Sequence, residues 1–238
     1  MSCGATEAHH VHRLAEAVRP LLVGAARYEP EPDPLRICML ACLDFQMRGT
    51  AVEKSLHHFY HEAAGALGIR DLATLTTYLE KTPSDEEAAV ALWGARYWTR
   101  LALLRQLIAF FRECGATGPS SVILSTPPFI LSEAKNLEGG QAAAEIEAMR
   151  RWGRSADFKR DFQGKVKGLG YNTFVRMVQQ LGANTAAPTG WTCHYVDGVL
   201  GMTPKDGCLV EVLNAAADTI GQPRAHVDWA IRRRQAHP

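Results

Sequence analysis

The stretch Val166–Leu200, VKGLGYNTFVRMVQQLGANTAAPTGWTCHYVDGVL, decides the fold of this 238-residue chain. A Gly-x-Gly turn at Gly168 and Gly170 separates two segments with helical patterns, and Pro188 opens a further helix. Because glycine adopts turn conformations that side chains disfavour, the pair predicts a tight hairpin with uncovered amides. The first amides of the next helix, aided by its dipole, suit a phosphate oxygen.

These features predict a helix-hairpin-helix element, which contacts a nucleic-acid backbone without reading its sequence. The charge distribution favours the same partner. Residues 1–149 carry 13 Lys and Arg against 18 Asp and Glu, whereas residues 150–238 carry 13 against 7. Such asymmetry indicates an anionic partner, and a solvated helix face is the alternative. The basic residues around the hairpin are Arg150, Arg151, Arg154, Lys159, Arg160, Lys165, Lys167 and Arg176.

Composition excludes several classes of protein. Hydrophobic residues make up 47% and charged residues 21% of the chain, which is typical of a globular protein. The sequence holds no apolar run long enough to span a bilayer and shows no secretory signal, so we expect no membrane partner. The scattered cysteines predict reduced, mostly buried thiols in a cytoplasmic protein. They are Cys3, Cys38, Cys42, Cys114, Cys193 and Cys208.

Helical periodicity predicts an all-α fold in three parts. Residues 1–34 form an N-terminal helix and linker, 35–201 form the main domain with an insert at about 116–140, and 202–238 form helices that pack back on the N-terminal half. The only strand candidate is 121–125. Helices are expected at 6–28, 35–44, 50–67, 84–93, 97–114, 207–220 and 226–234.

On these motifs the chain resembles the helix-hairpin-helix DNA glycosylase superfamily, with its endonuclease III-like fold. VKGLGYNTF at 166–174 is similar to the family's Leu-Pro-Gly-Val-Gly turn, and APTGW at 187–191 falls where the family has its catalytic motif. FQMRGTAVEK at 45–54 resembles a segment whose Gln enters the DNA stack, which places Gln46 there. WGARY at 93–97 falls on a turn that often supplies a wedge side chain. The resemblance implies a helical bundle with a central cleft and a monovalent cation in the hairpin, with no other cofactor.

The catalytic positions depart from the family. Thr189 stands where active members have Asp, Trp191 where they have His, and Asn172 where bifunctional members have a nucleophilic Lys. A carboxylate is needed to stabilise the positive charge that develops on the sugar, and an amine is needed to form a Schiff base. Thr189 is instead predicted to cap the helix that it precedes.

The resemblance therefore implies a DNA-binding protein of base-excision-repair type whose standard catalytic residues are replaced. One alternative is an active monofunctional DNA N-glycosylase, without lyase activity, that uses a substitute carboxylate at Asp44 or Asp197. Another is a helical protein that binds a different ligand in the same cleft. For both carboxylates, a surface or helix-pairing role is the competing interpretation.

The remaining candidate residues fall into three groups. Trp191, Tyr171 and Tyr195 are candidates for a base-stacking pocket, with core packing as the alternative. Glu53, His57 and His61 share one helix face beside His58, but no second helix offers a matching pair of ligands, so no metal site is predicted. The predicted DNA contacts are Gly168, Gly170, Lys167, Asn172, Thr173, Gln46 and Arg176.

Overall fold

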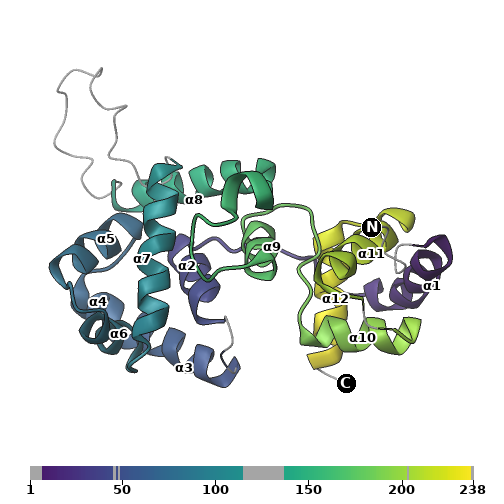
Figure 1. Cartoon of the computed structure of the whole chain (residues 1–238), viewed down its shortest axis with the longest axis horizontal. Helices are drawn as coiled ribbons and strands as arrows, with labels where there is room; N and C mark the ends of the chain where they lie inside the picture. The colour runs from purple at the N-terminus through teal and green to yellow at the C-terminus, as the bar shows by residue number, and fades with distance from the viewer. Residues whose placement is uncertain (1–6, 45–46, 48, 115–136, 203, 237–238) are drawn as a thin grey trace, which may run out of the picture. The chain divides into compact units, whose positions relative to one another are not determined.

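The computed structural model of the chain describes residues 7–44, 47, 49–114, 137–202 and 204–236 (Figure 1). Within these ranges the secondary structure is helical and contains no β-strand, which confirms the prediction of an all-α fold. The strand candidate at 121–125 and most of the expected insert lie outside the described residues. No helix among the described residues is both long and apolar enough to cross a bilayer.

The chain divides into two compact units whose boundaries differ from those expected. Unit 1 comprises Met1–Pro30 and Gly170–Pro238, and unit 2 comprises Glu31–Leu169. Helices that the sequence analysis assigned to the main domain, after Gly170, therefore belong with the two ends of the chain. The boundary between the two units, at Leu169 and Gly170, falls inside the glycine hairpin.

Unit 1 is built from helices at both ends of the chain. Its N-terminal helix stops early because Pro20 lies in the first turn of the 3-10 helix that follows, so the helix expected at 6–28 is shorter and broken. The elements are α1 (Ala8–Val18), η2 (3-10, Arg19–Leu22), α9 (Tyr171–Gln180), α10 (Gly190–Leu200), α11 (Asp206–Thr219) and α12 (Arg224–Ala236).

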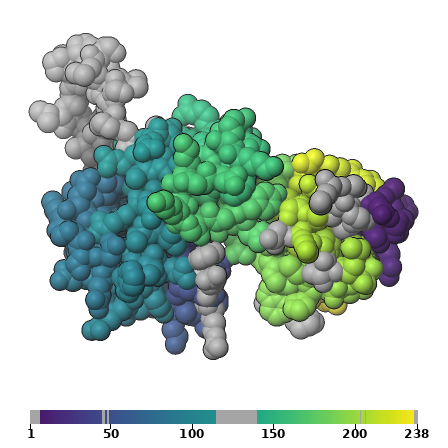
Figure 2. All heavy atoms as spheres, in the orientation of Figure 1, coloured from purple at the N-terminus to yellow at the C-terminus, as the bar shows by residue number. Residues whose placement is uncertain are grey.

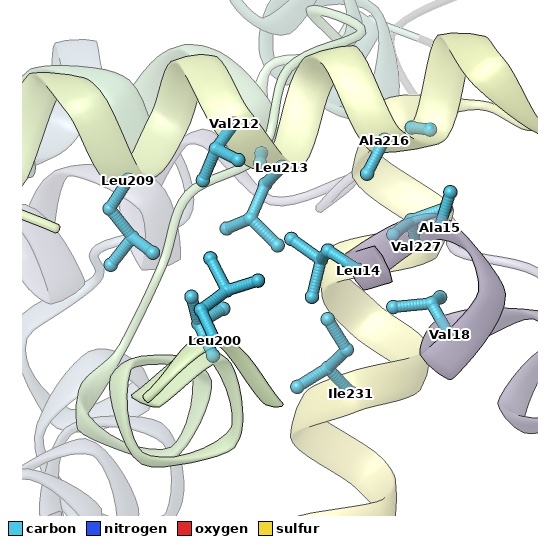
Figure 3. Packing of buried hydrophobic residues seen from close by; sticks show 13 residues of the cluster. Leu14, Ala15, Val18, Leu200, Leu209, Val212, Leu213, Ala216, Val227 and Ile231 are labelled. Atoms are coloured by element: carbon cyan, nitrogen blue, oxygen red, sulfur yellow. The ribbon is translucent and has the colours of Figure 1, made fainter. Parts of the chain in front are cut away.

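The core of unit 1 joins α1 to the C-terminal helices. In Figure 3, Leu14 and Val18 of α1 point toward Leu213 of α11 and Ile231 of α12, and all four side chains are fully buried. Each such side chain contributes about 1.5–3 kcal/mol by leaving water. In Figure 2 the purple N-terminal helix and the yellow C-terminal helices form one packed body.

Unit 2 is organised around the long apolar helix α7 (Trp98–Glu113), which packs against α2 (Pro34–Leu43), α5 (Leu72–Lys81) and α6 (Asp85–Trp93) (Figure 1). Phe111 and Leu104 of α7 are fully buried. The other elements are α3 (Gly49–His58), η3 (π, Phe59–Ala63), α4 (Ala64–Leu67), α8 (Leu137–Ser155) and η4 (π, Phe158–Phe162).

Two helix caps of unit 2 follow directly from the local sequence. Asp33 accepts a hydrogen bond from the Leu35 amide (2.8 Å) before α2, and Ser84 accepts one from the Glu87 amide (3.3 Å) before α6. Helix α5 was not expected from the sequence. Its first amides donate to Glu145, a buried carboxylate from α8 (2.9 and 3.2 Å), and burial raises the pKa of this carboxyl group.

The cysteines depart from the expectation of reduced, mostly buried thiols in two ways: Cys114 is exposed and Cys193 and Cys208 are only partly buried, and one cysteine is not a free thiol. Cys38, Cys42, Cys114 and Cys193 are free thiols, and burial raises the pKa of the Cys42 thiol above its ordinary value. Cys208 on α11 is disulfide-bonded, so the prediction of reduced thiols is wrong there. Spacing along the chain does not reveal this bond, because folding brings distant cysteines within reach.

Candidate nucleic-acid-binding hairpin

The segment before the hairpin is fixed to unit 2 by aromatic packing. Phe162, the last residue of η4, is fully buried and its ring lies 5.4 Å from Phe110 and 6.4 Å from Trp152, measured between centroids. Beyond it, Val166 and Leu169 are also buried, whereas the residues between and around them are exposed. Residues 163–170 thus form an exposed polar turn held by two apolar anchors.

The glycines of this turn have different physical roles. Gly168 has φ +97°, which favours glycine, and a Cβ added there would lie 3.1 Å from Leu103 Cδ2, so the Leu103 side chain would have to shift slightly. Gly164 also has a positive φ (+78°) but open space around it. Gly170 has φ −101° and nothing within 4 Å of an added Cβ, so the fold itself does not require glycine at this position.

Some amides of the turn are already hydrogen-bonded, so fewer N–H groups are available to a phosphate than the sequence predicted. The Leu169 N–H donates to the Val166 carbonyl (3.3 Å), and the Lys167 N–H donates to Gln106 Oε1 of α7 (3.1 Å). Among the described residues, the amides of Gly168 and Gly170 have no acceptor, and both glycines are exposed. These two N–H groups are the donors that the turn offers to a ligand.

The basic residues around the turn separate into engaged and exposed groups. Arg160 pairs with Asp161 (2.6 Å) and lowers the pKa of that carboxyl to about 2, while Arg150 pairs with Glu147 (3.0 Å). Of the basic residues around the turn, the exposed ones outside these two ion pairs are Arg151, Arg154, Lys159, Lys165 and Lys167.

In unit 1, helix α9 begins directly after the turn, with Gly170 as its N-cap residue. Glycine offers no side chain as a cap, so the positive end of this helix lacks the usual side-chain oxygen. Asn172 is exposed, and Tyr171 and Thr173 are partly buried. Arg176, predicted as a DNA contact, is partly buried near Arg232 and Asp228, and burial lowers its pKa. We therefore leave it out of the binding surface.

The segment where the family has its catalytic motif is held by a buried carboxylate in unit 1. Asp228 of α12 is fully buried. It accepts hydrogen bonds from the Ala187 amide (3.2 Å) and the Thr192 hydroxyl (3.1 Å). It also accepts one from Gln179 Nε2 (3.1 Å) and pairs with Arg232 (3.0 Å). Asp228 is not among the residues predicted from the sequence, although its i,i+4 spacing to Arg232 is a visible signal.

Thr189 is the N-cap residue of α10, as predicted, and its amide donates to the Thr192 hydroxyl (3.2 Å). The candidate substitute carboxylates are placed in different units. Asp44 is the partly buried C-cap residue of α2 in unit 2, whereas Asp197 is exposed on α10 in unit 1. Gln46, the predicted stack-entering residue, lies outside the described residues.

The candidate stacking residues differ in exposure. Trp191 is 54% exposed in the first turn of α10, so its indole does not fill a cavity in unit 1. Tyr195 is partly buried, and its hydroxyl donates to the Ala17 carbonyl of α1 (2.7 Å), which favours the packing role that the sequence left open. The turn expected to supply a wedge, residues 93–97, connects α6 to α7.

Comparisons of the chain with family models, with curated proteins and with solved structures find no match. The function is therefore inferred from the residues and their geometry.

Proposed function

We propose that this protein binds duplex DNA through the turn at 163–170, as a glycosylase-like protein of base-excision-repair type whose standard catalytic residues are replaced. One observation carries the proposal. The exposed amides of Gly168 and Gly170 have no acceptor among the described residues, and they stand in a turn that also carries the exposed Lys165 and Lys167.

This combination suits a phosphate group for two physical reasons. The uncovered N–H groups of Gly168 and Gly170 can each donate a hydrogen bond to a phosphate oxygen, and the N-terminus of the helix that begins after Gly170 adds a partial positive charge. Lysine side chains add full charges that displace the counterions of DNA. Neither contact reads base edges, so we expect binding that depends on salt and little on sequence.

We also propose that the protein releases bases from DNA only weakly or not at all. Thr189 and Asn172 supply neither a carboxylate nor an amine at the family positions. Asp228 of α12 lies close to Thr189 in the fold, although the two residues are far apart in the sequence. Its oxygens already accept three hydrogen bonds and form an ion pair with Arg232. A carboxylate engaged in this way supports the entrance to α10 instead of orienting a water molecule.

The direct test is fluorescence anisotropy of the full chain with a labelled duplex, measured over a series of salt concentrations. We expect Lys165→Glu/Lys167→Glu to weaken binding at low salt and to reduce the slope of log K against log salt by about 2, since each lysine neutralises one phosphate. Lys81→Glu, an exposed lysine in the last turn of α5, is the matched charge control. Equal affinity and slope in the parent and the double variant would contradict the proposal.

A second variant tests the amides without changing charge. Gly170→Ala adds one methyl group in open space, so the fold should tolerate it while the approach of a phosphate is hindered. Gly198→Ala on α10, also in open space, is the matched control. We expect weaker DNA binding for Gly170→Ala alone, with a small loss of thermal stability because alanine is a poorer N-cap residue than glycine, and equal or better stability for Gly198→Ala.

The resemblance also implies a monovalent cation coordinated by carbonyl groups of the turn. If such an ion supports the turn, DNA affinity should be higher in potassium or sodium chloride than in choline chloride at equal ionic strength. Identical affinities in the three salts would remove the ion from the proposal and leave the amide and lysine contacts in place.

A further inference from the structure

The helical stretch from α3 through η3 to α4 in unit 2 contains a widened turn. The Ala64 N–H donates to the carbonyl of Phe59, five residues earlier, which defines the π-helix. π-turns inside helices are rare and occur frequently at functional positions. Three histidines, His57, His58 and His61, lie at the start of this turn.

His58 is engaged by the fold. Its Nδ1 lies 3.0 Å from Glu62 Oε2, and its Nε2 lies 3.3 Å from the Ala91 carbonyl of α6. A Cβ added to Gly94 would lie 3.2 Å from the His58 ring. The imidazole is thus fixed between its own helix and α6, and it fixes the rotation of the helix that carries its neighbours.

His57 and His61 are exposed and have no such role. Their ring centroids are 4.3 Å apart and the ring planes are inclined by 35°. Both side chains are exposed, and neither ring forms a hydrogen bond or ion pair with another described residue. Their spacing of four residues is the one by which a single helix face presents two imidazoles to zinc.

The surroundings add carboxylate groups. An open pocket of about 340 Å³ next to His57 is lined by Glu53, Lys54, His57, His58 and Glu62. Glu53 lies one turn before His57, so rotation of its side chain brings an oxygen toward the two rings. His61 does not line this pocket, and Glu62 there already pairs with His58, so Glu53 is the carboxylate that remains for a cation held by His57.

We propose that His57 and His61 bind a divalent transition-metal ion of the zinc, nickel or copper class, with Glu53 as an additional ligand and water in the remaining positions. Imidazole is a preferred ligand of these ions, with metal–nitrogen distances of about 2.0–2.1 Å for zinc. Small rotations about the side-chain bonds bring two ring nitrogens, one from each exposed imidazole, to a common ion. The site is independent of the proposed DNA contact.

A competing cluster exists in unit 1, where ligand atoms of Glu7, His9 and His10 lie within 4.8 Å of one another. It lies at the N-cap and first turn of α1. The positive end of a helix dipole opposes a cation there. The pair His57–His61 is not at a helix N-terminus, and a cation near it meets no such opposition. We therefore expect the His57–His61 pair to bind a metal ion more tightly than the cluster of Glu7, His9 and His10 does.

The test is a titration of the metal-free full chain with zinc or nickel chloride, followed by isothermal calorimetry and by competition with a chromophoric chelator. His57→Ala and His61→Ala should each weaken the tighter site at least about tenfold, because loss of even an outer-shell partner of a metal ligand reduces affinity 10- to 100-fold. Glu53→Gln should weaken it less. His194→Ala, an exposed histidine on α10, is the single-residue control.

The variant His9→Ala/His10→Ala separates the two clusters. The proposal requires that this variant keep the tighter site and that His57→Ala/His61→Ala lose it. Retention of the tighter site by His57→Ala/His61→Ala, or its loss in His9→Ala/His10→Ala, would overturn the assignment. Because the rings are exposed, the metal-free variants should melt like the parent. Ring-proton NMR shifts of His57 and His61 on addition of zinc to the parent give a readout that does not depend on variant folding.

Discussion

The Lys167 backbone N–H donates to the side-chain oxygen of Gln106, 3.1 Å away and 61 residues earlier in the chain. The Gln106 side chain of α7 therefore helps to position the turn that we propose for DNA binding, together with the buried Val166 and Leu169. The bond uses the backbone of Lys167 and leaves its exposed ammonium group available.

This relationship predicts that Gln106→Ala weakens DNA binding although Gln106 is not a proposed DNA contact. The variant removes one hydrogen bond, worth about 0.5–1.5 kcal/mol, and loosens the turn before it meets a phosphate. Gln106→Glu keeps the acceptor and should retain both stability and the position of the turn. Urea unfolding and anisotropy on the same samples check this, and an Ala variant with parental affinity would show that the bond does not position the turn.

The two positive-φ glycines of the turn should respond differently to alanine. Gly168→Ala meets a strained backbone and Leu103 at 3.1 Å, whereas Gly164→Ala meets the strained backbone alone. A non-glycine residue in this region costs about 1–3 kcal/mol, so we expect Gly164→Ala near the lower end and Gly168→Ala near the upper end. Thermal denaturation of the two variants decides this, and equal losses would show that Leu103 adapts without cost.

Asp228 should be among the most sensitive residues of unit 1. Asp228→Ala leaves the partly buried Arg232 without its carboxylate and removes the acceptor of the Ala187 amide. Breaking a buried pair in this way costs about 3–5 kcal/mol. Asp218→Ala, which breaks an exposed pair with Arg224, is the control and should cost at most about 1 kcal/mol. Similar losses in both variants would contradict the structural role given to Asp228.

We expect the stability of the protein to depend on pH through the carboxyl group of Asp161. Arg160 and the Asp157 amide hold the pKa of this carboxyl at about 2 in the folded protein, below its ordinary value of 3.8. A lowered pKa contributes stability that is complete above the unfolded value and is lost as pH falls toward 2. Asp161→Asn should flatten the stability curve between about pH 4 and 2, and added salt should reduce the difference because the pair is exposed. Chemical denaturation at several pH values measures this.

Local sequence patterns predicted most of the helices and their caps. Periodicity located α2, α6, α7 and α12, and Ser84 and Thr189 are the N-cap residues that their side chains favoured. Helix α5 was missed although Asp71 and Thr74 form a local capping box at its start; its first amides also donate to Glu145 of α8, a partner that no local pattern shows. The π-turn at Phe59–Ala63 was also missed, and it packs against α6, a contact that no local pattern shows.

The candidate site was predicted only in part. The glycines of the turn and its lysines are visible in the sequence, because turn chemistry and charge are local properties. The capture of the Lys167 amide by Gln106 and the burial of Arg176 depend on contacts between distant segments. Asp228 was overlooked because its partners Gln179, Ala187 and Thr192 lie far from it in the sequence.

The discontinuity of unit 1 has a consequence for synthesis on the ribosome. Every helix of unit 2 precedes Gly170, so its core can close while the last third of the chain is still being translated. Helix α1 emerges before all of these helices, but its partners α10 and α11 come after the whole of unit 2. Until then the apolar side chains of Leu14 and Val18 remain exposed on the nascent chain. A chaperone that binds short apolar helices would bind the protein at this stage.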